Sequence, residues 1–255
     1  MLSIDLNCDM GEGYPNDEQI LPFITSVNIA CGFHAGDKAT MQRTVEAALK
    51  NNVAIGAHPS YPGRENFGRT DLLHTTVSLQ DLQAIVQEQI VLLQQICSDL
   101  GTSLHHVKPH GALYNRAAWD DAAADYICKA ICETDQSLLL YGLSGSKMEM
   151  AAMTAGLEYV HEVFADRSYQ PDGSLTPRSQ PNALIEDSAV SLQQVLTMIR
   201  EGMVKTITGQ SIPLKAETIC IHGDGAHAVL FAKTIHAALQ ENNIILKSTA
   251  KNEQR

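Results

Sequence analysis

Residues 26–58 read SVNIACGFHAGDKATMQRTVEAALKNNVAIGAH, and this run contains one complete strand–helix–strand unit. An apolar stretch at 26–31 precedes a segment at 38–51 whose apolar residues recur at helical spacing, and a second apolar stretch follows at 53–57. Asp37 stands directly before the helical segment, where its carboxylate can accept hydrogen bonds from the first backbone N–H groups. This order predicts two parallel strands joined by a helix.

The same alternation recurs along the chain. Apolar runs predict seven strands, at 3–7, 26–31, 53–57, 105–108, 138–143, 158–163 and 218–222. Segments with helical periodicity predict helices at 38–51, 79–100, 120–134, 147–155, 190–202 and 226–242. Between the first two strands the helix is expected to be short or missing. Repeated units of this kind predict an α/β fold with parallel strands.

Length and composition favour one domain. A chain of 255 residues, 44% of them hydrophobic, can bury a single large core. We expect one domain over residues 1–247 and a polar C-terminal tail over 248–255. The stretch at 166–187 is rich in Pro, Gly, Ser and Arg, which predicts a long loop after the sixth strand.

Charge and hydropathy exclude several classes of partner. Lys and Arg number 18 against 29 Asp and Glu, a net charge of −11, so a broad basic surface for nucleic acid or anionic lipid is not expected. No run approaches the roughly 18 apolar residues that span a bilayer, and the first nine residues do not resemble a signal peptide. Six cysteines without a CxxC pair predict reduced thiols. We therefore expect a cytoplasmic location.

Polar residues follow the predicted strands, at the rim where barrel enzymes place their active sites. In the first strand, period two puts Asp5, Asn7 and Asp9 on one face. Burial of three such groups in an apolar barrel is costly, and this favours a function for Asp5. For Asp9 and Glu12 the default interpretation is a solvated turn, which accounts less well for Asp5 inside the strand.

The next strand ends bring histidines and cations. His34 follows the second strand between two glycines and just before a helix, and His58 ends the third. The fourth strand end has the densest group, in which Lys108 suits an anion and His110 suits proton transfer near neutral pH. Further polar residues at these strand ends are Tyr114, Arg167, His222 and Asp224.

Motif searches exclude three mechanisms. The sequence has no GxxxxGK[ST] phosphate loop, no GxSxG nucleophile elbow and no HExxH zinc pair. Nucleotide binding by a phosphate loop, serine hydrolysis and zincin-type proteolysis are therefore not predicted.

Several motifs together resemble the LamB/YcsF family over nearly the whole chain. They are DLNCDMGE (5–12), NIACGFHAGD (28–37), GAHPSY (56–61), VKPHGALY (107–114), EVFADRSY (162–169) and IHGD (221–224). The resemblance implies a distorted seven-stranded β/α barrel related to glycoside hydrolase and deacetylase barrels. It also implies a 5-oxoprolinase (ATP-hydrolysing) reaction, in which this chain works with subunits B and C to cleave 5-oxo-L-proline to L-glutamate.

Roles for the site residues follow from this expectation. Asp5 or His110 would deprotonate water, while Lys108 and Arg167 would stabilise negative charge. We expect ATP to act as a co-substrate through the partner subunits, and we assign no metal ligand. The residues expected to bind substrate are Asn7, His34, His58, Tyr114, Arg167, His222 and Asp224.

Two alternatives remain open from the residues. Asp5, His34 and His58 could converge around a divalent ion, giving a metal-dependent hydrolase or deacetylase. The same polar rim could also hold a ligand without turnover, in a non-catalytic accessory module.

Overall fold

The fold is that of a computed structural model, which describes residues 2–221 and 228–250. Within these ranges seven parallel strands close into a barrel in the order β1-β2-β3-β4-β5-β6-β9, and β9 pairs back onto β1. The predicted α/β barrel of seven strands is confirmed. The barrel strands are β1 (Ser3–Met10), β2 (Ser26–Ala30), β3 (Ala54–His58), β4 (His106–Val107), β5 (Leu139–Leu143), β6 (Tyr159–Phe164) and β9 (Thr218–Ile221).

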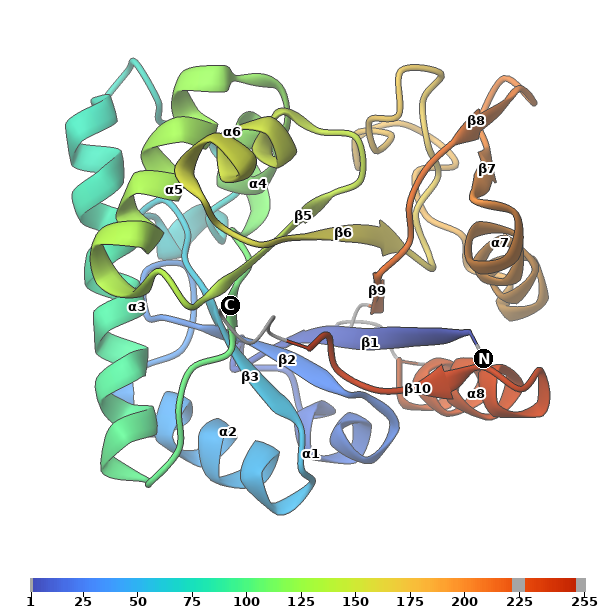
Figure 1. Ribbon diagram of the computed structural model, residues 1–255, viewed down its shortest axis with the longest axis horizontal. Helices are drawn as coiled ribbons and strands as arrows, with labels where there is room; N and C mark the ends of the chain where they lie inside the picture. Colours follow the sequence, from blue (N-terminus) through green and yellow to red (C-terminus); the bar gives the residue numbers. More distant parts are fainter. Residues whose placement is uncertain (1, 222–227, 251–255) are drawn as a thin grey trace.

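Helices surround the barrel (Figure 1). They are α1 (Asp17–Ile20), α2 (Lys38–Lys50), α3 (Leu79–Asp99), α4 (Gly111–Trp119), α5 (Asp121–Asp135), α6 (Lys147–Ala155), α7 (Ser188–Glu201) and α8 (Ala228–Glu241), with 3-10 turns η1 (Leu21–Phe23) and η2 (Arg64–Asn66). The six predicted helices are confirmed within a few residues. The connection between β1 and β2 holds only α1 and η1, as expected. Sequence periodicity missed α4.

Local signals explain where helices begin. The Asp37 carboxylate accepts a hydrogen bond from the backbone N–H of Thr40, as predicted for the cap of α2. Ser78 and Asp81 form a reciprocal capping box at the start of α3. Each helix then buries an apolar face against the barrel or a neighbouring helix, and α3 packs along α5.

Three short strands were not predicted. β10 (Ile245–Leu246) pairs with the start of β1. β7 (Met203–Lys205) and β8 (Ser211–Pro213) form a hairpin between α7 and β9. The predicted long loop at 166–187 precedes α7, and Tyr169 bridges both Leu175 and Thr206, which ties the loop to the hairpin.

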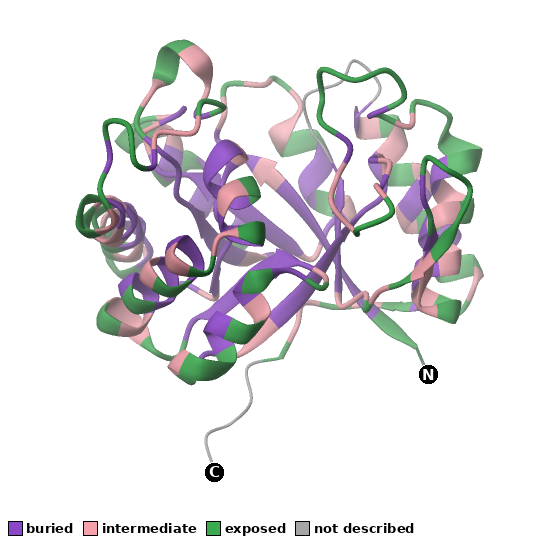
Figure 2. Ribbon diagram, turned by 90° about the horizontal axis from the view of Figure 1, so that it is seen from above, coloured by how far each residue is buried: buried purple, intermediate pink, exposed green. Residues whose placement is uncertain are grey.

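The barrel interior is polar, in contrast to its apolar outer face. Alternation along β1 turns Leu6 and Cys8 toward the apolar core, while Asn7 points inward to polar partners. The strands form the buried centre of the molecule in Figure 2. A Cβ atom on Gly56 would lie 2.1 Å from the His106 ring, so only glycine leaves room for that inward imidazole.

The residues after β10 contact the amino-terminal end of the barrel. Tyr141 and Thr249 share a hydrogen bond of 2.7 Å between their hydroxyl groups, and His105 Nε2 lies 2.9 Å from the Thr249 carbonyl oxygen. Thr249 belongs to the segment predicted as a polar tail, and it contacts the barrel through these bonds.

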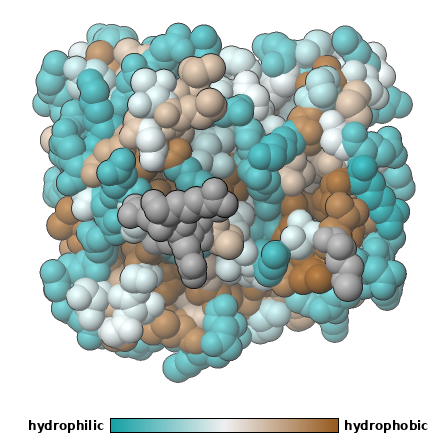
Figure 3. All heavy atoms as spheres, in the orientation of Figure 1, coloured by the Kyte–Doolittle hydropathy of each residue, from teal (hydrophilic) through white to brown (hydrophobic). Residues whose placement is uncertain are grey.

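Hydrophilic residues cover much of the face drawn in Figure 3, and apolar residues on it gather mainly in the right half. Across the described ranges, every helix is too short or too polar to qualify as a membrane span.

Candidate active site

A cavity of about 680 Å³ opens at the carboxyl ends of the barrel strands. In barrels of this type, the loops at that end carry the functional groups. The charged and hydrogen-bonding residues that line it include Asp9, Glu12, His58, Arg69, Lys108, His110, Tyr114, Arg167 and Arg178. The cavity therefore offers cationic groups at several points, together with two carboxylates.

Lys108 lies at the centre of this constellation. Its ammonium nitrogen lies 2.9 Å from Oδ1 of Asp9 and 2.8 Å from Oε1 of Glu162. Asn7 completes the arrangement, because its carbonyl oxygen accepts from Lys108 at 3.2 Å and its amide group donates to Glu162 at 3.0 Å. A buried cation is thus paired and hydrogen-bonded on several sides.

The charge of Lys108 follows from this pairing. Burial alone lowers the pKa of Lys108, but the neighbouring negative charges, with Asp9 foremost, outweigh burial and hold it well above its usual value. The Cys220 sulfur lies 3.2 Å from the ammonium nitrogen, and burial raises the pKa of this thiol well above its usual value. The thiol is therefore neutral near pH 7, and the carboxylates keep Lys108 protonated.

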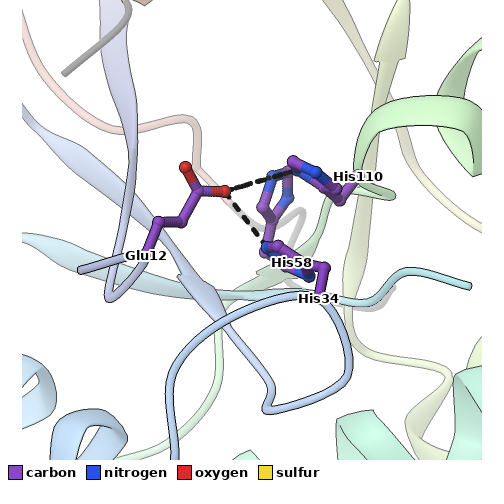
Figure 4. A group of neighbouring side chains, drawn as sticks. All are labelled: Glu12, His34, His58 and His110. Carbon is purple, nitrogen blue, oxygen red and sulfur yellow. Dashed lines mark hydrogen bonds and ion pairs between the residues drawn. The ribbon is translucent and has the colours of Figure 1, made fainter. Parts of the chain in front are cut away.

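Three imidazoles and the carboxylate of Glu12 meet in one cluster (Figure 4). His34 follows β2, His58 ends β3, and His110 is the N-cap residue of α4 after β4. The His34 and His110 rings stack with centroids 3.8 Å apart, and His58 Nε2 lies 2.9 Å from His110 Nδ1. Glu12, in the loop after β1, places Oε1 3.1 Å from His34 Nε2 and 3.4 Å from His110 Nδ1.

These imidazoles differ in their affinity for protons. Burial, followed by the charge of His58, lowers the pKa of His34 to about 3. The same two causes lower the pKa of His110 to about 3. Burial alone lowers the pKa of His58, but the charge of Asp9 and a hydrogen bond to it more than compensate, so the pKa of His58 is raised.

A loop after β3 covers the imidazoles. The Phe67 carbonyl oxygen lies 2.9 Å from His110 Nε2, and the Phe67 ring meets His34 edge to face. Gly68 has a φ of +63°, and a Cβ atom there would lie 3.0 Å from His34 Cβ and 3.1 Å from His110 Cδ2. Only glycine lets the loop approach this closely.

Tyr114 and Arg167 line the cavity, where the sequence predicted them. The Tyr114 hydroxyl and Oε2 of Glu162 are buried without a hydrogen-bond partner among the described residues. Arg167 donates from its guanidinium to the carbonyl oxygens of Thr176 (2.6 Å) and Ala183 (3.3 Å), and this fixes it within the 166–187 loop.

Asp5 lies elsewhere, at the amino-terminal end of the barrel. Its carboxylate accepts hydrogen bonds from Thr25 (2.5 Å), Ser26 (2.7 Å) and Thr218 (2.6 Å), and it borders a separate small cavity. Burial raises the pKa of Asp5 despite these bonds. Asp5 does not join Lys108 and His110 at the main cavity, because it lies two layers below Asp9 on the same face of β1. His222 and Asp224 lie outside the described residues.

Asp9, Glu12, Glu162 and Phe67 belong to the site although the sequence did not assign them to it. Asp9 follows the period-two pattern that marked Asp5 and Asn7, since β1 continues to Met10. That pattern was the available signal for Asp9. Glu12 and Phe67 lie in irregular loops and had no comparable signal.

The structure replaces the set of residues that the sequence suggested as metal ligands. Asp5 is remote, so the trio of Asp5, His34 and His58 does not form. Among the described residues, one group of four side chains could hold a metal ion, each offering one ligand atom within 4.8 Å of the others: Glu12, His34, His58 and His110.

Fold and cavity together define a closed parallel β/α barrel protein with a polar, partly cationic site at the carboxyl ends of its strands. Comparison with known families identifies it further, because a model of the LamB/YcsF family matches residues 4–254. The chain belongs to this family.

Similar proteins cover almost the whole chain. A protein of Tolumonas auensis and one of Brevibacillus brevis, each named as the A subunit of 5-oxoprolinase, are both 51% identical to it. The first alignment covers 97% of this chain and 100% of the relative, and the second covers 96% and 98%. The crystal structure of a lactam utilization protein from Thermus thermophilus superposes with a TM-score of 0.90 at 36% identity, over 97% of this chain and 100% of that one.

More distant structures share only the fold. A T48 deacetylase with substrate superposes with a TM-score of 0.52 at 12% identity, over 97% of this chain and 88% of that one. The expected relation to deacetylase barrels is confirmed at the level of architecture.

Proposed function

We propose that this chain is the A subunit of an ATP-dependent 5-oxoprolinase and opens the lactam of 5-oxo-L-proline to L-glutamate. The names of its relatives at 51% identity and of the Thermus protein support this reaction class. The observation that carries the proposal is the Lys108 ammonium group, held between Asp9 and Glu162 beside the cavity. It places a fixed positive charge next to carboxylates that can accept protons, as hydrolysis of an anionic amide requires.

ATP enters the reaction through partner subunits B and C. A five-membered lactam resists simple hydrolysis, and its oxygen becomes a good leaving group once it is phosphorylated. This chain contributes no GxxxxGK[ST] loop of its own. We assign transfer of the phosphoryl group to the partners and ring opening to the barrel.

Ring opening would consume two water molecules. The first adds to the phosphorylated carbon, after which the carbon–nitrogen bond breaks and leaves the amine of glutamate and an acyl phosphate. The second hydrolyses the acyl phosphate to the carboxylate and inorganic phosphate. Each addition needs a base for the water and a cation for the developing negative charge.

Asp9 is the base that the geometry favours. It lines the cavity, and its Oδ1 is held by Lys108 while Oδ2 lies 3.4 Å from His58 Nε2. The predicted base His110 fits less well, because His58 and the Phe67 carbonyl occupy its two ring nitrogens. Asp5 fits least well, because it does not line this cavity.

Cations at the cavity suit the carboxylate and phosphate groups of the substrate. Lys108 pairs with the carboxylates of Asp9 and Glu162. Arg167 and Arg178 border the same cavity from the 166–187 loop. We assign Lys108 to the reacting end of the substrate and Arg167 to binding of an anionic group.

A cytoplasmic location is part of the proposal. All six cysteines are free, and five of them are buried. Free thiols in this number suit a reducing compartment, where disulfides rarely persist.

Glutamate release from 5-oxo-L-proline tests the proposal. The purified chain is assayed alone and with candidate subunits B and C, each with and without ATP. We expect glutamate only in the complete mixture with ATP. Asp9→Asn should abolish it, while Asp121→Asn, a change at an exposed carboxylate that pairs with Lys147, should leave it unchanged.

The non-catalytic alternative predicts a different outcome. An accessory module would bind 5-oxo-L-proline, measured by calorimetry, yet give no glutamate in a mixture whose subunits demonstrably assemble. That result would overturn the catalytic proposal.

A further inference from the structure

Each of the three site imidazoles has one inner nitrogen, which faces the other members of the cluster, and one outer nitrogen, which points away from it. All three outer nitrogens face hydrogen-bond acceptors. His58 Nδ1 lies 2.7 Å from the Lys108 carbonyl oxygen, and His110 Nε2 lies 2.9 Å from the Phe67 carbonyl oxygen. A carbonyl oxygen can only accept, so both outer nitrogens carry hydrogen.

The outer nitrogen of His34, Nδ1, also carries hydrogen, because its partner is the hydroxyl oxygen of Ser60. The Ser60 hydroxyl donates its hydrogen to the Tyr61 carbonyl oxygen at 2.8 Å. It therefore accepts from His34 Nδ1, which lies 2.9 Å away. The outer nitrogen of His34 is thus also a donor.

In the neutral form of each ring, the inner nitrogen therefore carries a lone pair and no hydrogen. His58 Nε2 and His110 Nδ1 lie 2.9 Å apart, and His34 Nε2 lies 3.1 Å from Oε1 of Glu12. These pairs of acceptors repel one another unless a cation lies among them. One proton can join only two of the four atoms, whereas a metal ion can bind all four at once.

The spacing of the four atoms fits such an ion. Oε1 of Glu12 lies 3.4 Å from His110 Nδ1 and 3.9 Å from His58 Nε2, and the two shorter separations are 2.9 and 3.1 Å. Ligands at about 2.0–2.2 Å from a tetrahedral zinc ion lie about 3.3–3.6 Å from one another. All four atoms lie within 4.8 Å of one another, and small side-chain shifts would bring these four separations into that range.

We propose that Glu12, His34, His58 and His110 form a binding site for a divalent transition metal ion of the zinc class. The ligands come from the ends of four adjacent barrel strands, β1 to β4 (Figure 4). Three imidazoles and one carboxylate select such an ion over Mg²⁺ or Ca²⁺, which prefer oxygen. Metal-binding histidines are usually oriented by an outer N–H group that donates to an oxygen acceptor, as all three rings do here.

This site does not depend on the reaction proposed above. Glu12, His58 and His110 also line the main cavity, so the metal would form part of its wall. Its test can therefore use binding alone and needs neither partner subunits nor substrate.

Titration of the chelator-stripped chain with Zn²⁺ and with Co²⁺ tests the proposal. We expect one-to-one binding of Zn²⁺, a rise in the melting temperature, and no response to Mg²⁺. Bound Co²⁺ should give the visible spectrum of nitrogen and oxygen ligands without the thiolate charge-transfer band, which excludes the six cysteines. No Zn²⁺ uptake at neutral pH would overturn the proposal and leave a proton as the cation of the cluster.

Variants locate the bound ion. His34→Gln and Glu12→Gln should each weaken Zn²⁺ binding at least about tenfold, a loss that changes to the groups supporting a metal ligand already reach. His236→Gln is the matched control, because His236 Nδ1 also lies 2.9 Å from a carbonyl oxygen, that of Phe23, but outside the cluster. Equal Zn²⁺ affinity in all three variants would place the metal elsewhere and overturn the site. Should a variant fail to fold, the Co²⁺ spectrum of the unsubstituted chain still decides between nitrogen and thiolate ligands.

Discussion

Lys108 Nζ and Glu162 Oε1 lie 2.8 Å apart, and both side chains are buried. The pair joins the end of β4 to β6 across the barrel interior. Asp9 Oδ1 lies 2.9 Å from the same ammonium group, so one cation pairs with two carboxylates. Stability and proposed chemistry therefore depend on the same side chain.

Lys108→Met should abolish glutamate formation and lower the free energy of unfolding by about 3–5 kcal/mol, because it leaves the buried Glu162 and the partly buried Asp9 without their partner. The double variant Lys108→Met/Glu162→Gln removes one of those charges. We expect it to regain part of the stability, measured by urea unfolding, and none of the activity. A double variant as unstable as the single one would show that the pair does not carry this energy.

Asp5→Asn should leave the rate of glutamate formation close to that of the unsubstituted protein. Asp5 borders the small cavity at the amino-terminal end and does not line the main one. The free energy of unfolding should fall by about 1–3 kcal/mol, because three hydroxyl donors lose an ideal acceptor. Asp9→Asn is the contrasting variant on the same strand. Loss of activity in a folded Asp5→Asn protein would restore Asp5 to the mechanism.

Sequence patterns predicted most of the barrel, because each strand and helix carries its own periodic signal. The signal failed where elements are very short, as in β10, or begin directly after a strand end, as in α4. Closure through β1 and β9 could not be derived from spacing, since residues 5–8 and 218–221 lie far apart in the chain. Family resemblance supplied that closure.

Only part of the site was predicted, because only the residues at strand ends carry a signal in the sequence. Strand ends marked Lys108, His58 and His110, which the fold brings together. Periodicity also marked Asp5, but it could not tell which layer of the barrel faces the cavity. Glu12 reaches the imidazoles only because the loop after β1 folds back, with Asp17 accepting a hydrogen bond from the Gly11 N–H at 2.7 Å. Such loop geometry leaves no periodic trace.

Asp17 should make stability depend on pH. Burial, partly offset by the Gly11 hydrogen bond, raises the pKa of Asp17 from 3.8 to about 6. Between these values the folded protein binds more protons at Asp17 than the unfolded chain does, so its contribution to the free energy of unfolding falls as pH rises through that window. Asp17→Asn should remove this contribution and make the variant relatively more stable at pH 7 than at pH 4.

Urea unfolding at several pH values from about 3 to 7 measures this difference, because the window then includes pH values below the unfolded pKa of an Asp carboxyl. Asp37→Asn is a control of opposite sign, because hydrogen bonds from Thr40 lower the pKa of the exposed Asp37 carboxylate. Its contribution to stability is present above the unfolded pKa and lost as pH falls. Parallel curves for Asp17→Asn and the unsubstituted protein would contradict the assigned shift.

Gly68→Ala should disturb the imidazole cluster from outside it. The residue has a φ of +63°, and the new Cβ atom would lie 3.0–3.2 Å from atoms of His34, His110 and Ser60. We expect the left-handed conformation to cost about 1–3 kcal/mol. The crowding should also shift the rings, so Zn²⁺ affinity and glutamate formation should both fall.

Gly101→Ala separates backbone strain from this crowding. Gly101 also has a positive φ, +73°, but a Cβ atom there would meet nothing within 4 Å. Its variant should lose comparable stability in urea unfolding while keeping the Zn²⁺ affinity of the unsubstituted chain. Only close contact with the rings distinguishes the two glycines, so a fall in affinity confined to Gly68→Ala would assign the effect to displaced ligands. Equal affinities in both variants would mean that the loop yields to the added methyl group and leaves the cluster intact.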